Sequence, residues 1–563
     1  MAAAPLSIVA GPPLAEEAEL GELTLPGWFR TVCENGGQAE ALVYYEGGFD
    51  GARIGWTYAE LWVRANAVAR SLIACGVSKG TRVGVLMTNR PEFLSATFGI
   101  ALAGGVATTL STFSTPAELE YLLEASGISV LLLEAQVLKK DFAGIIAGFD
   151  PAIAEGQAGK ITANRFPYLT HVAAIGDGLG AIETWTHFLA RGAGVAQARV
   201  DARAAQVKPA DPGVLFFSSG STAKPKGILS AHRGVTLQLW RWPKWYATRP
   251  REVRCWSANG FFWSGNFSMA FGGALSSGGS LVLQSTFNAD EALALIERER
   301  ATMILAWPHQ WEQLIAAPDW ASADLSSLIY IDCKSPIAQH PSVNSTWREP
   351  YAAFGNTETF TLMSTYPANT PDEVVAGSHG LPCPGNVFKV VDPLTGETVM
   401  MGERGEICVK GPTLMLGYIG IPLDETLDGE GFFRTGDGGW FDDAGRLHWE
   451  GRLNDIIKTG GANVSPVEVD TLIRSMGGVK ISQTVGVPHD TLGELVVTCI
   501  VAHDGAELDA NTVKAFAKQQ LASFKVPREV LFFAEDELAT TGTNKIKTAE
   551  LRKLASERLE SVT

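Results

Sequence analysis

The chain has 563 residues, of which 46% are hydrophobic and 19% are charged. This length and composition are typical of a soluble globular enzyme with more than one domain, and they exclude an intrinsically disordered chain. The formal net charge of −16 argues against DNA or RNA as a main partner, because nucleic-acid phosphates bind basic surfaces.

Cysteine content and apolar runs indicate the cellular compartment. The seven cysteines are scattered and form no Cys-x-x-Cys pair, which favours a reducing compartment and no zinc site. Residues 1–14 are apolar but contain no Lys or Arg, so they make a poor signal peptide. No apolar run reaches the roughly 18 residues of a transmembrane helix. We therefore expect a cytoplasmic protein, and we leave open a homodimer and peripheral membrane association.

Residues 1–25 are predicted to form a flexible leader. From Trp56 onward, strand-like and helix-like runs alternate, which predicts parallel strands joined by helical crossovers in a layered α/β domain. Residues 145–212 are rich in Ala, Gly and Pro and are predicted to form irregular connections. The predicted strands are 82–87, 128–133, 279–283 and 302–306, and the predicted helices are 91–103 and 289–300.

The pattern changes after about residue 380, where short β-like runs are separated by Gly and Asp turns. These runs predict a small, more antiparallel β subdomain. A second change, after Arg452, predicts a compact α/β unit, so we divide the chain into a large domain at 26–452 and a small domain at 453–563. The predicted strands are 385–392, 405–410, 446–449, 495–502 and 529–533, and the predicted helices are 466–476 and 511–521.

A polar loop follows the buried apolar run 214–217 and has the chemistry of a polyphosphate-binding loop. Its hydroxyls and backbone N–H groups can donate to phosphate oxygens, its glycine allows close approach, and its lysines supply positive charge. It lacks the Gly-Lys-Ser/Thr ending of a Walker A loop, and a surface Ser/Gly hairpin is the alternative. The candidate phosphate-binding residues are Ser218, Ser219, Gly220, Ser221, Thr222, Lys224 and Lys226.

The segment 353–358 could add an adenine and metal site. Phe354 can stack on adenine, and Gly355 beside it leaves room for the ligand. Thr357 can hydrogen-bond a phosphate, and Glu358 can present a carboxylate to Mg²⁺, which prefers oxygen ligands. The alternative is a loop that ends in a helix cap.

Two further turns each carry a charged side chain. The segment 431–437 ends in Asp437, which can accept hydrogen bonds from both ribose hydroxyls; an Asp-Gly hairpin turn is the alternative. The segment 541–547 presents Lys545 next to a Gly-marked turn. An exposed lysine of this kind is usually only a solvated charge.

The segment 450–461 crosses the predicted domain boundary. It places the cations Arg452 and Lys458 near the boundary. Gly460 and Gly461 can admit a ligand close to the backbone, because they carry no side chain.

In this order and spacing, the five segments resemble the adenylate-forming superfamily of acyl-CoA synthetases, adenylation domains of peptide synthetases and beetle luciferases. The resemblance extends from about Trp56 to Leu554 and implies ATP, Mg²⁺ and coenzyme A as cofactors. It implies an N-terminal ATP- and acyl-binding domain and a mobile C-terminal domain. A carboxylate first attacks the α-phosphate of MgATP, and a thiol then attacks the acyl-adenylate after the C-terminal domain has rotated. The first step joins two anions, so it needs positioning and charge neutralisation.

The resemblance also implies the role of each residue. The catalytic residues are Lys545, which would bridge the carboxylate and the α-phosphate, Glu358, which would hold Mg²⁺, and Thr222, which would bind phosphate. The remaining positions would bind the nucleotide or coenzyme A: Ser218, Ser219, Gly220, Ser221, Lys226, Phe354, Gly355, Thr357, Asp437, Arg452, Lys458, Gly460 and Gly461.

Several positions depart from the family's pattern. Ala223 replaces a common Gly in the phosphate loop, and Phe354 replaces a commoner Tyr. Asn454 stands at the hinge, where Asp or Lys is usual, and Asn tolerates unusual backbone angles. In the unusual segment 331–336, Lys334 either reaches a polar group on the acid or points to solvent.

The acid-binding pocket is expected around Phe261, Phe262 and Trp263, because this aromatic density suits an apolar or ring-bearing acid. Ordinary core packing is the alternative for these rings. His232 is expected to be local scaffolding rather than a catalyst. We therefore predict an AMP-forming acid:CoA ligase for a hydrophobic carboxylic acid. The alternatives are an acyl-AMP ligase that loads a carrier protein and a nucleotide-binding relative without turnover.

Overall fold

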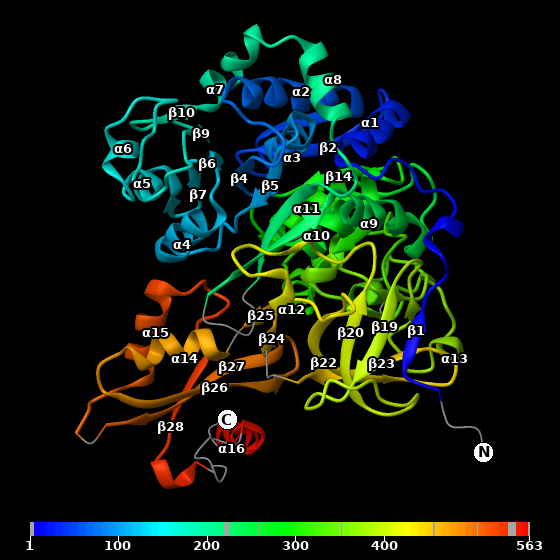
Figure 1. Cartoon of the computed structure of the whole chain (residues 1–563), viewed down its shortest axis with the longest axis vertical. Coiled ribbons are helices and arrows are strands. Elements are labelled where there is room, and N and C mark those ends of the chain that lie inside the picture. Colours follow the sequence, from blue (N-terminus) through cyan, green and yellow to red (C-terminus); the bar gives the residue numbers. More distant parts are fainter. Residues whose placement is uncertain are drawn as a thin grey trace.

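The computed structural model describes residues 5–218, 224–257, 259–350, 352–453, 457–464, 466–503, 505–538 and 548–560. They form a large N-terminal domain with a small C-terminal unit against one side of it (Figure 1). The mixed α/β class predicted from the sequence is confirmed. None of the helices in these ranges has the length and apolarity needed to span a bilayer.

The first sheet of the N-terminal domain has eight strands in the order β10-β9-β6-β4-β5-β11-β12-β21. Pairing is parallel from β10 to β11 and antiparallel at β12 and β21. Along β6, Val130 and Leu132 enter one hydrophobic core, whereas Leu131 and Leu133 enter another. Both faces of the strand are thus buried, which explains its continuous apolar sequence. The strands are β4 (Arg82–Leu86), β5 (Val106–Thr109), β6 (Val130–Glu134), β9 (His171–Ile175), β10 (Ile182–Thr184), β11 (Pro212–Ser218), β12 (Lys226–Ala231) and β21 (Gly417–Tyr418).

The second sheet has the order β15-β13-β14-β2-β3 and is parallel except for β3. Helix α3 (Pro91–Ala103) is buried on nearly every side, and this is why its sequence is apolar all round. The strands are β2 (Glu40–Glu46), β3 (Ala52–Thr57), β13 (Arg254–Ser257), β14 (Ser280–Leu283) and β15 (Met303–Leu305). The other main helices of this region are α1 (Leu25–Gly36), α2 (Tyr58–Ala74), α4 (Pro116–Ser126), α9 (His232–Trp245), α10 (Ser264–Ala270), α11 (Ala289–Arg298) and α12 (Pro308–Ile315).

The segment 145–212 is more regular than we expected. It contains β9 and β10, and β9 pairs in parallel with β6 inside the first sheet. Short strands of this kind owe their formation to a neighbouring strand rather than to local sequence, so the prediction of irregular connections was wrong. The helices around them are α5 (Phe142–Ala147), α6 (Pro151–Ala154), α7 (Trp185–Arg191) and α8 (Gln197–Ala205).

The β subdomain is an antiparallel sheet in the order β1-β19-β20-β22-β23. Strand β1 comes from the segment expected to be a flexible leader, and Glu17 nearby pairs with the fully buried Arg241 at 2.7 Å. Residues 5–25 are therefore part of the N-terminal domain. Their sequence did not indicate this, because their partners lie far along the chain. The strands are β1 (Ile8–Ala10), β19 (Val387–Val391), β20 (Gly405–Lys410), β22 (Phe433–Phe441) and β23 (Leu447–Arg452), and beside them lie β16 (Ala353–Phe354), β17 (Ser364–Thr365), β18 (Leu381–Pro382) and α13 (Asp372–Val375).

The C-terminal unit has its own sheet, in the order β25-β24-β27-β26 with β28 paired to β27. Helices α14 and α15 pack in one hydrophobic cluster of this unit, and α16 packs in another. The domain boundary expected near Arg452 falls between β23 and this sheet. The elements are β24 (Ile457–Thr459), β25 (Ala462–Val464), α14 (Pro466–Arg474), β26 (Val479–His489), β27 (Gly493–Ala502), α15 (Ala510–Gln520), β28 (Glu529–Phe532) and α16 (Thr548–Glu560).

Candidate active site

A cavity of about 640 Å³ lies where the N-terminal domain faces the C-terminal unit. The carboxyl ends of β5 and β11 open into it, as do β16, β22 and β24. Ligands commonly bind at the carboxyl ends of parallel strands. Of the residues singled out in the sequence, the wall contains Ser218, Phe262, Trp263, Phe354, Gly355, Thr357, Asp437, Lys458 and Gly461.

Ser218 ends β11 at the start of the predicted phosphate loop. It pairs across an antiparallel hairpin with Lys226, the first residue of β12. Within the described residues its buried hydroxyl has no hydrogen-bond partner. Because buried hydroxyls are normally paired, Ser218 supplies a free donor at the cavity wall. The flanking strands β11 and β12 form an antiparallel pair, while residues 219–223 of the predicted loop lie outside the described residues.

Glu358 is oriented by an aromatic residue that sequence reasoning missed. The hydroxyl of Tyr418 donates to Oε1 of Glu358 at 2.8 Å, and Nζ of Lys226 lies 4.9 Å from the centre of the same ring. In the described part of the chain, no three His, Cys, Asp or Glu side chains gather to hold a metal. The half-buried Glu358 suits Mg²⁺, which commonly takes one or two protein carboxylates together with substrate phosphates.

The turn after β16 can be built only with glycine at position 355. A Cβ atom there would lie 1.4 Å from the backbone oxygen of Thr361. The turn presents Thr357, whose Oγ1 accepts a hydrogen bond from the Ser264 hydroxyl at 3.3 Å. Both hydroxyls line the cavity. Phe354, in β16, forms part of the same wall.

Asp437, in β22, is buried, with 3% of its surface exposed, and lines the cavity. The indole N–H of Trp449 donates to its Oδ1 at 3.1 Å. Nζ of Lys458 lies 3.6 Å from the centre of the Trp449 ring. The backbone N–H of Trp449 donates to Nδ1 of His379 at 3.1 Å. Burial, followed by the charges of His448 and Lys458, lowers the pKa of His379. A carboxylate, an indole, an ammonium group and a neutral imidazole therefore meet here.

The C-terminal unit brings its glycine turn to the cavity. Gly461 has a φ of +77°, and a Cβ atom on it would lie 2.5 Å from the Trp307 ring. Trp307 also lines the cavity. A side chain at position 461 would therefore be strained in its backbone and would clash with the N-terminal domain.

Two contacts hold the C-terminal unit in this position. Lys525 is buried and pairs with Glu118 of the N-terminal domain at 3.1 Å and with Glu468 of its own unit at 2.8 Å. The two carboxylates keep the pKa of Lys525 raised although burial alone lowers it. The Phe524 ring meets the Trp263 ring edge to face, with 6.1 Å between their centres. Sequence reasoning missed these partners, since neither ion pair is local in sequence.

Several predicted site residues lie outside the described residues: Ser219, Gly220, Ser221, Thr222, Asn454 and Lys545. For Arg452, only the backbone is described, and it pairs with Asp437. Gly460 belongs to the turn between β24 and β25.

Three other residues are placed away from the cavity. Phe261 is 1% exposed and packs against Phe93 and Phe271 in the core, so it is not part of the cavity wall. Lys334 pairs with Asp372 at 3.1 Å on the surface, with 61% of its side chain exposed. His232 is buried, and its Nδ1 accepts from the backbone N–H of Leu25 at 3.3 Å, as expected of scaffolding.

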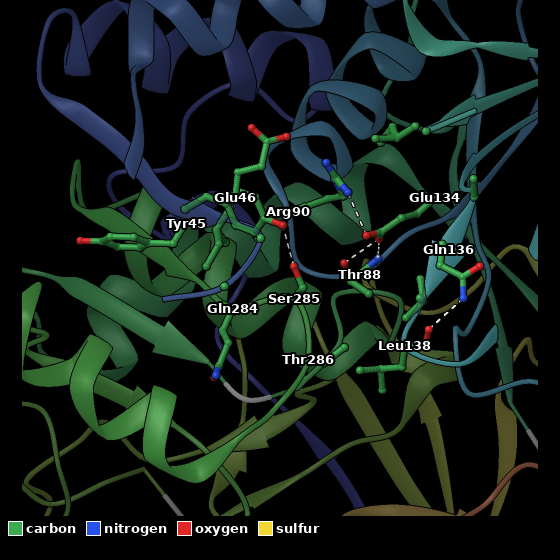
Figure 2. Close-up of a pocket in the computed structure, with 18 of the residues that line it drawn as sticks. Tyr45, Glu46, Thr88, Arg90, Glu134, Gln136, Leu138, Gln284, Ser285 and Thr286 are labelled. Carbon is green, nitrogen blue, oxygen red and sulfur yellow. Dashed lines mark hydrogen bonds and ion pairs between the residues drawn. The ribbon is translucent and has the colours of Figure 1, made fainter. Parts of the chain in front are cut away.

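A second cavity, of about 820 Å³, opens at the carboxyl ends of β4, β6 and β14 (Figure 2). Arg90 pairs there with Glu134 at 2.8 Å, and the Thr88 hydroxyl donates to the same carboxylate at 2.7 Å. Tyr44 and Ser285 share a hydrogen bond of 2.8 Å, and the Arg90 guanidinium lies 5.8 Å from the centre of the Tyr44 ring. None of the residues singled out from the sequence lines this cavity.

Two family profiles match the chain in sequence order. The profile of the AMP-binding enzyme family matches residues 29–419, and that of the AMP-binding enzyme C-terminal domain matches residues 468–545. The chain belongs to the AMP-binding enzyme family. The first profile covers more than half of the chain and includes most of the cavity wall from the N-terminal domain.

Curated relatives of this AMP-binding enzyme are named as CoA ligases or synthases. It is 31% identical over 514 residues to the 3-[(3aS,4S,7aS)-7a-methyl-1,5-dioxo-octahydro-1H-inden-4-yl]propanoyl:CoA ligase of Mycobacterium tuberculosis, covering 89% of this chain and 94% of the relative. It is 31% identical over 507 residues to a feruloyl-CoA synthase of an Amycolatopsis species, covering 88% and 93%. It is 30% identical over 513 residues to an indoleacetate–CoA ligase of Aromatoleum aromaticum, covering 89% and 94%.

Solved structures share the fold of this AMP-binding enzyme. The amide bond synthetase McbA from Marinactinospora thermotolerans matches with a TM-score of 0.71 at 24% identity, covering 94% of this chain and 99% of that one. ATP-bound MatB from Rhodopseudomonas palustris matches with a TM-score of 0.60 at 26% identity, covering 94% and 99%. The chain is an ATP-dependent, AMP-forming acid:CoA ligase that uses Mg²⁺ and coenzyme A.

Proposed function

We propose that this enzyme activates a hydrophobic, ring-bearing carboxylic acid. The observation that carries the proposal is that one cavity combines polar groups suited to a nucleotide with the aromatic side chains of Phe262 and Trp263. Aromatic walls favour flat or ring-shaped apolar ligands. Three relatives named above carry ring-bearing acyl groups in their names: feruloyl, indoleacetate and a methyl-dioxo-octahydroindenyl propanoyl group.

In the first half-reaction, a carboxylate oxygen of the acid forms a bond to the α-phosphorus of ATP as the bond to pyrophosphate breaks. Ser218 and Thr357 would donate to phosphate oxygens, and Asp437 would accept from the ribose hydroxyls. Glu358 would hold Mg²⁺, which neutralises charge on the phosphates. We also assign Thr222 and Lys545 to this step, by resemblance to the family.

In the second half-reaction, the sulfur of the CoA thiolate attacks the acyl carbon, and AMP leaves with the electron pair. Gly461 and Lys458 would border the path of the thiol. Their position at the cavity wall supports this role, and so does the close fit of Gly461 against Trp307. The described arrangement of the C-terminal unit therefore suits thioester formation.

The cytoplasm is the proposed location of the enzyme. All seven cysteines are free thiols, and five of them are buried, which is typical of a reducing compartment. A homodimer stays a prediction, and light scattering from the purified chain would test it.

The proposed function is tested by pyrophosphate release from ATP across a panel of aryl, alicyclic and fatty acids, with and without CoA, followed by mass detection of the products. We expect AMP and a CoA thioester from ring-bearing acids. Turnover restricted to straight-chain acids would contradict the proposed substrate class. Pyrophosphate release without a thioester would indicate transfer to a carrier protein instead.

A further inference from the structure

A smaller cavity of about 90 Å³ adjoins the main cavity of the active site. It shares five wall residues with the main cavity: Asn259, Gly265, Asn266, Met269 and Trp307. The two cavities are therefore outer and inner parts of one region. The inner wall comes from β15, α10 and α12, from residues that flank them or follow α9, and from the segment 330–349, and most of its residues are apolar. A group that enters past Met269 would leave bulk water behind.

The hydroxyl of Tyr246 is an unpaired polar group at the inner cavity. Tyr246 follows α9 directly and is 1% exposed. Its ring is stacked on Trp242, with 4.8 Å between centres, and its backbone oxygen accepts from the indole N–H of Trp347 at 2.8 Å. These contacts fix the side chain, yet its hydroxyl has no hydrogen-bond partner among the described residues. Buried hydroxyls are normally satisfied, so this one is a candidate hydrogen-bonding group for a bound acid.

Glu349 lies in the same wall and places a carboxyl group near Tyr246. Its backbone N–H donates to Asp332 at 2.8 Å, but its carboxyl group makes no hydrogen bond within the described residues. Burial and then the charge of Asp332 raise the pKa of Glu349 to about 7. Burial and then the charge of Glu349 raise the pKa of Tyr246, as expected for two neighbouring groups.

The other polar groups of the wall already have partners. Asn266 accepts from Ser257 at 2.8 Å and donates to the backbone oxygen of Asn259. Asn259 accepts from Gln310 at 3.2 Å. The Tyr330 hydroxyl donates to Glu252 and accepts from the backbone N–H of Arg249 at 2.9 Å.

Besides Tyr246 and Glu349, one more side chain of the inner wall has a buried polar group without a hydrogen-bond partner among the described residues. Trp311 lines the inner cavity, and its buried indole N–H has no hydrogen-bond partner in the part of the chain that the structure describes. It adds a second free donor to that of Tyr246, and Glu349 is the neighbouring acceptor. Among the described residues, the inner cavity therefore offers two donors and one acceptor beside polar groups that are already paired within the protein.

We propose that Tyr246, Trp311 and Glu349 recognise a hydroxyl group at the end of the acid remote from its carboxylate. A hydroxyl accepts one hydrogen bond from Tyr246 or Trp311 and donates one to Glu349. A second carboxylate would be repelled by Glu349 and Asp332, and a methyl group would leave all three groups unpaired. This inference rests on the proposed ring-bearing substrate and narrows it to hydroxylated acids.

The test compares matched acids that differ only in the distal hydroxyl, such as 3-(4-hydroxyphenyl)propanoate with 3-phenylpropanoate, over side chains of increasing length. The readout is kcat/KM for thioester formation. We expect the best hydroxylated acid to exceed its deoxy partner by at least about 10-fold, because a site that binds a hydroxyl disfavours analogues lacking it. In Tyr246→Phe and in Glu349→Met, each of which removes one hydrogen-bonding group, this ratio should fall below the wild-type value, and it should approach one in the double variant.

Tyr330→Phe is the matched control, because it removes a hydroxyl of the same wall that is already paired within the protein. Its selectivity ratio should stay at the wild-type value. Turnover of ring-bearing acids with a ratio near one in every pair would overturn the inference and leave the proposed function standing. A preference for the oxo over the hydroxyl form of the same acid would also overturn it. Absence of turnover on every ring-bearing acid, with straight-chain acids processed, would overturn both proposals.

Discussion

The indole N–H of Trp449 donates to Oδ1 of Asp437 at 3.1 Å, across the paired strands β22 and β23. This hydrogen bond holds the carboxylate at the cavity wall, where we propose that it accepts from the ribose hydroxyls. The Asp437→Ala variant should raise KM for ATP by about 10- to 100-fold, since a hydrogen bond to a charged group contributes about 1.5–3 kcal/mol. Trp449→Phe keeps a ring but removes the donor, so a smaller rise is expected. ATP–pyrophosphate exchange measures both; equal KM values in all three proteins would refute the ribose role.

Glu358 and Lys545 should affect the first half-reaction. Glu358→Ala should lower turnover by about 100-fold or more and shift the Mg²⁺ dependence, because it removes a metal ligand. Lys545→Ala should lower adenylate formation far more than thioester formation from a supplied acyl-adenylate. A Mg²⁺ titration tests Glu358, and an unchanged Mg²⁺ profile would contradict its role as a metal ligand. Single-turnover assays of each half-reaction test Lys545, and equal losses in both half-reactions would contradict its role in adenylate formation.

Gly461→Ala should damage the second half-reaction. The added methyl group meets the Trp307 ring, and the backbone φ of +77° disfavours any side chain. We expect thioester formation to slow by about 10-fold or more, as misplacement near the reacting atoms has large effects. Gly477→Ala is the control, because a Cβ atom there meets open space. If both variants form thioester at the wild-type rate, Gly461 does not need to lie against Trp307.

Glu118→Gln should weaken the docking of the C-terminal unit. It removes one of the two carboxylates that pair with the buried Lys525. Loss of a partner of a buried charge costs about 3 kcal/mol, so thioester formation should slow while ATP–pyrophosphate exchange stays near wild type. Glu120→Gln is the control, since Glu120 pairs with Arg165 at the surface. Equal rates in the two variants would show that this ion pair does not support the thioester-forming arrangement.

Glu349 should make stability depend on pH. Its pKa is about 7 in the folded chain, against an ordinary value of 4.5. Its contribution to stability is therefore fully present below about pH 4.5 and is lost as the pH rises through 7. The change in the free energy of unfolding from wild type to Glu349→Gln should favour the variant more at pH 8 than at pH 5. The expected difference between the two pH values is on the order of 1–3 kcal/mol. Thermal unfolding at both pH values measures the change. The exposed Glu373→Gln is the control, and an equal effect there would contradict the assignment.

Local patterns allowed much of the fold to be predicted. Apolar runs and helical periodicity identified strands such as β20 and helices such as α3 close to their observed bounds. The strand β1 and the pair β9 and β10 were missed, because short strands form only when a distant partner is present. Ile8 pairs with Lys389, and nothing near Ile8 in sequence indicates this.

The sequence by itself determined the chemistry of the site, since motif residues such as Asp437, Thr357 and Gly461 are defined by type and order and reach one cavity. Only the tertiary structure decided which side chains orient them. Trp449 and Tyr418 bond to Asp437 and Glu358 across separate segments, and Lys525 reaches Glu118 over 407 positions. The same holds for Tyr246 and Glu349, whose meeting in the inner cavity follows from packing between distant segments. Such contacts arise from burial and complementarity, which a one-dimensional pattern does not encode.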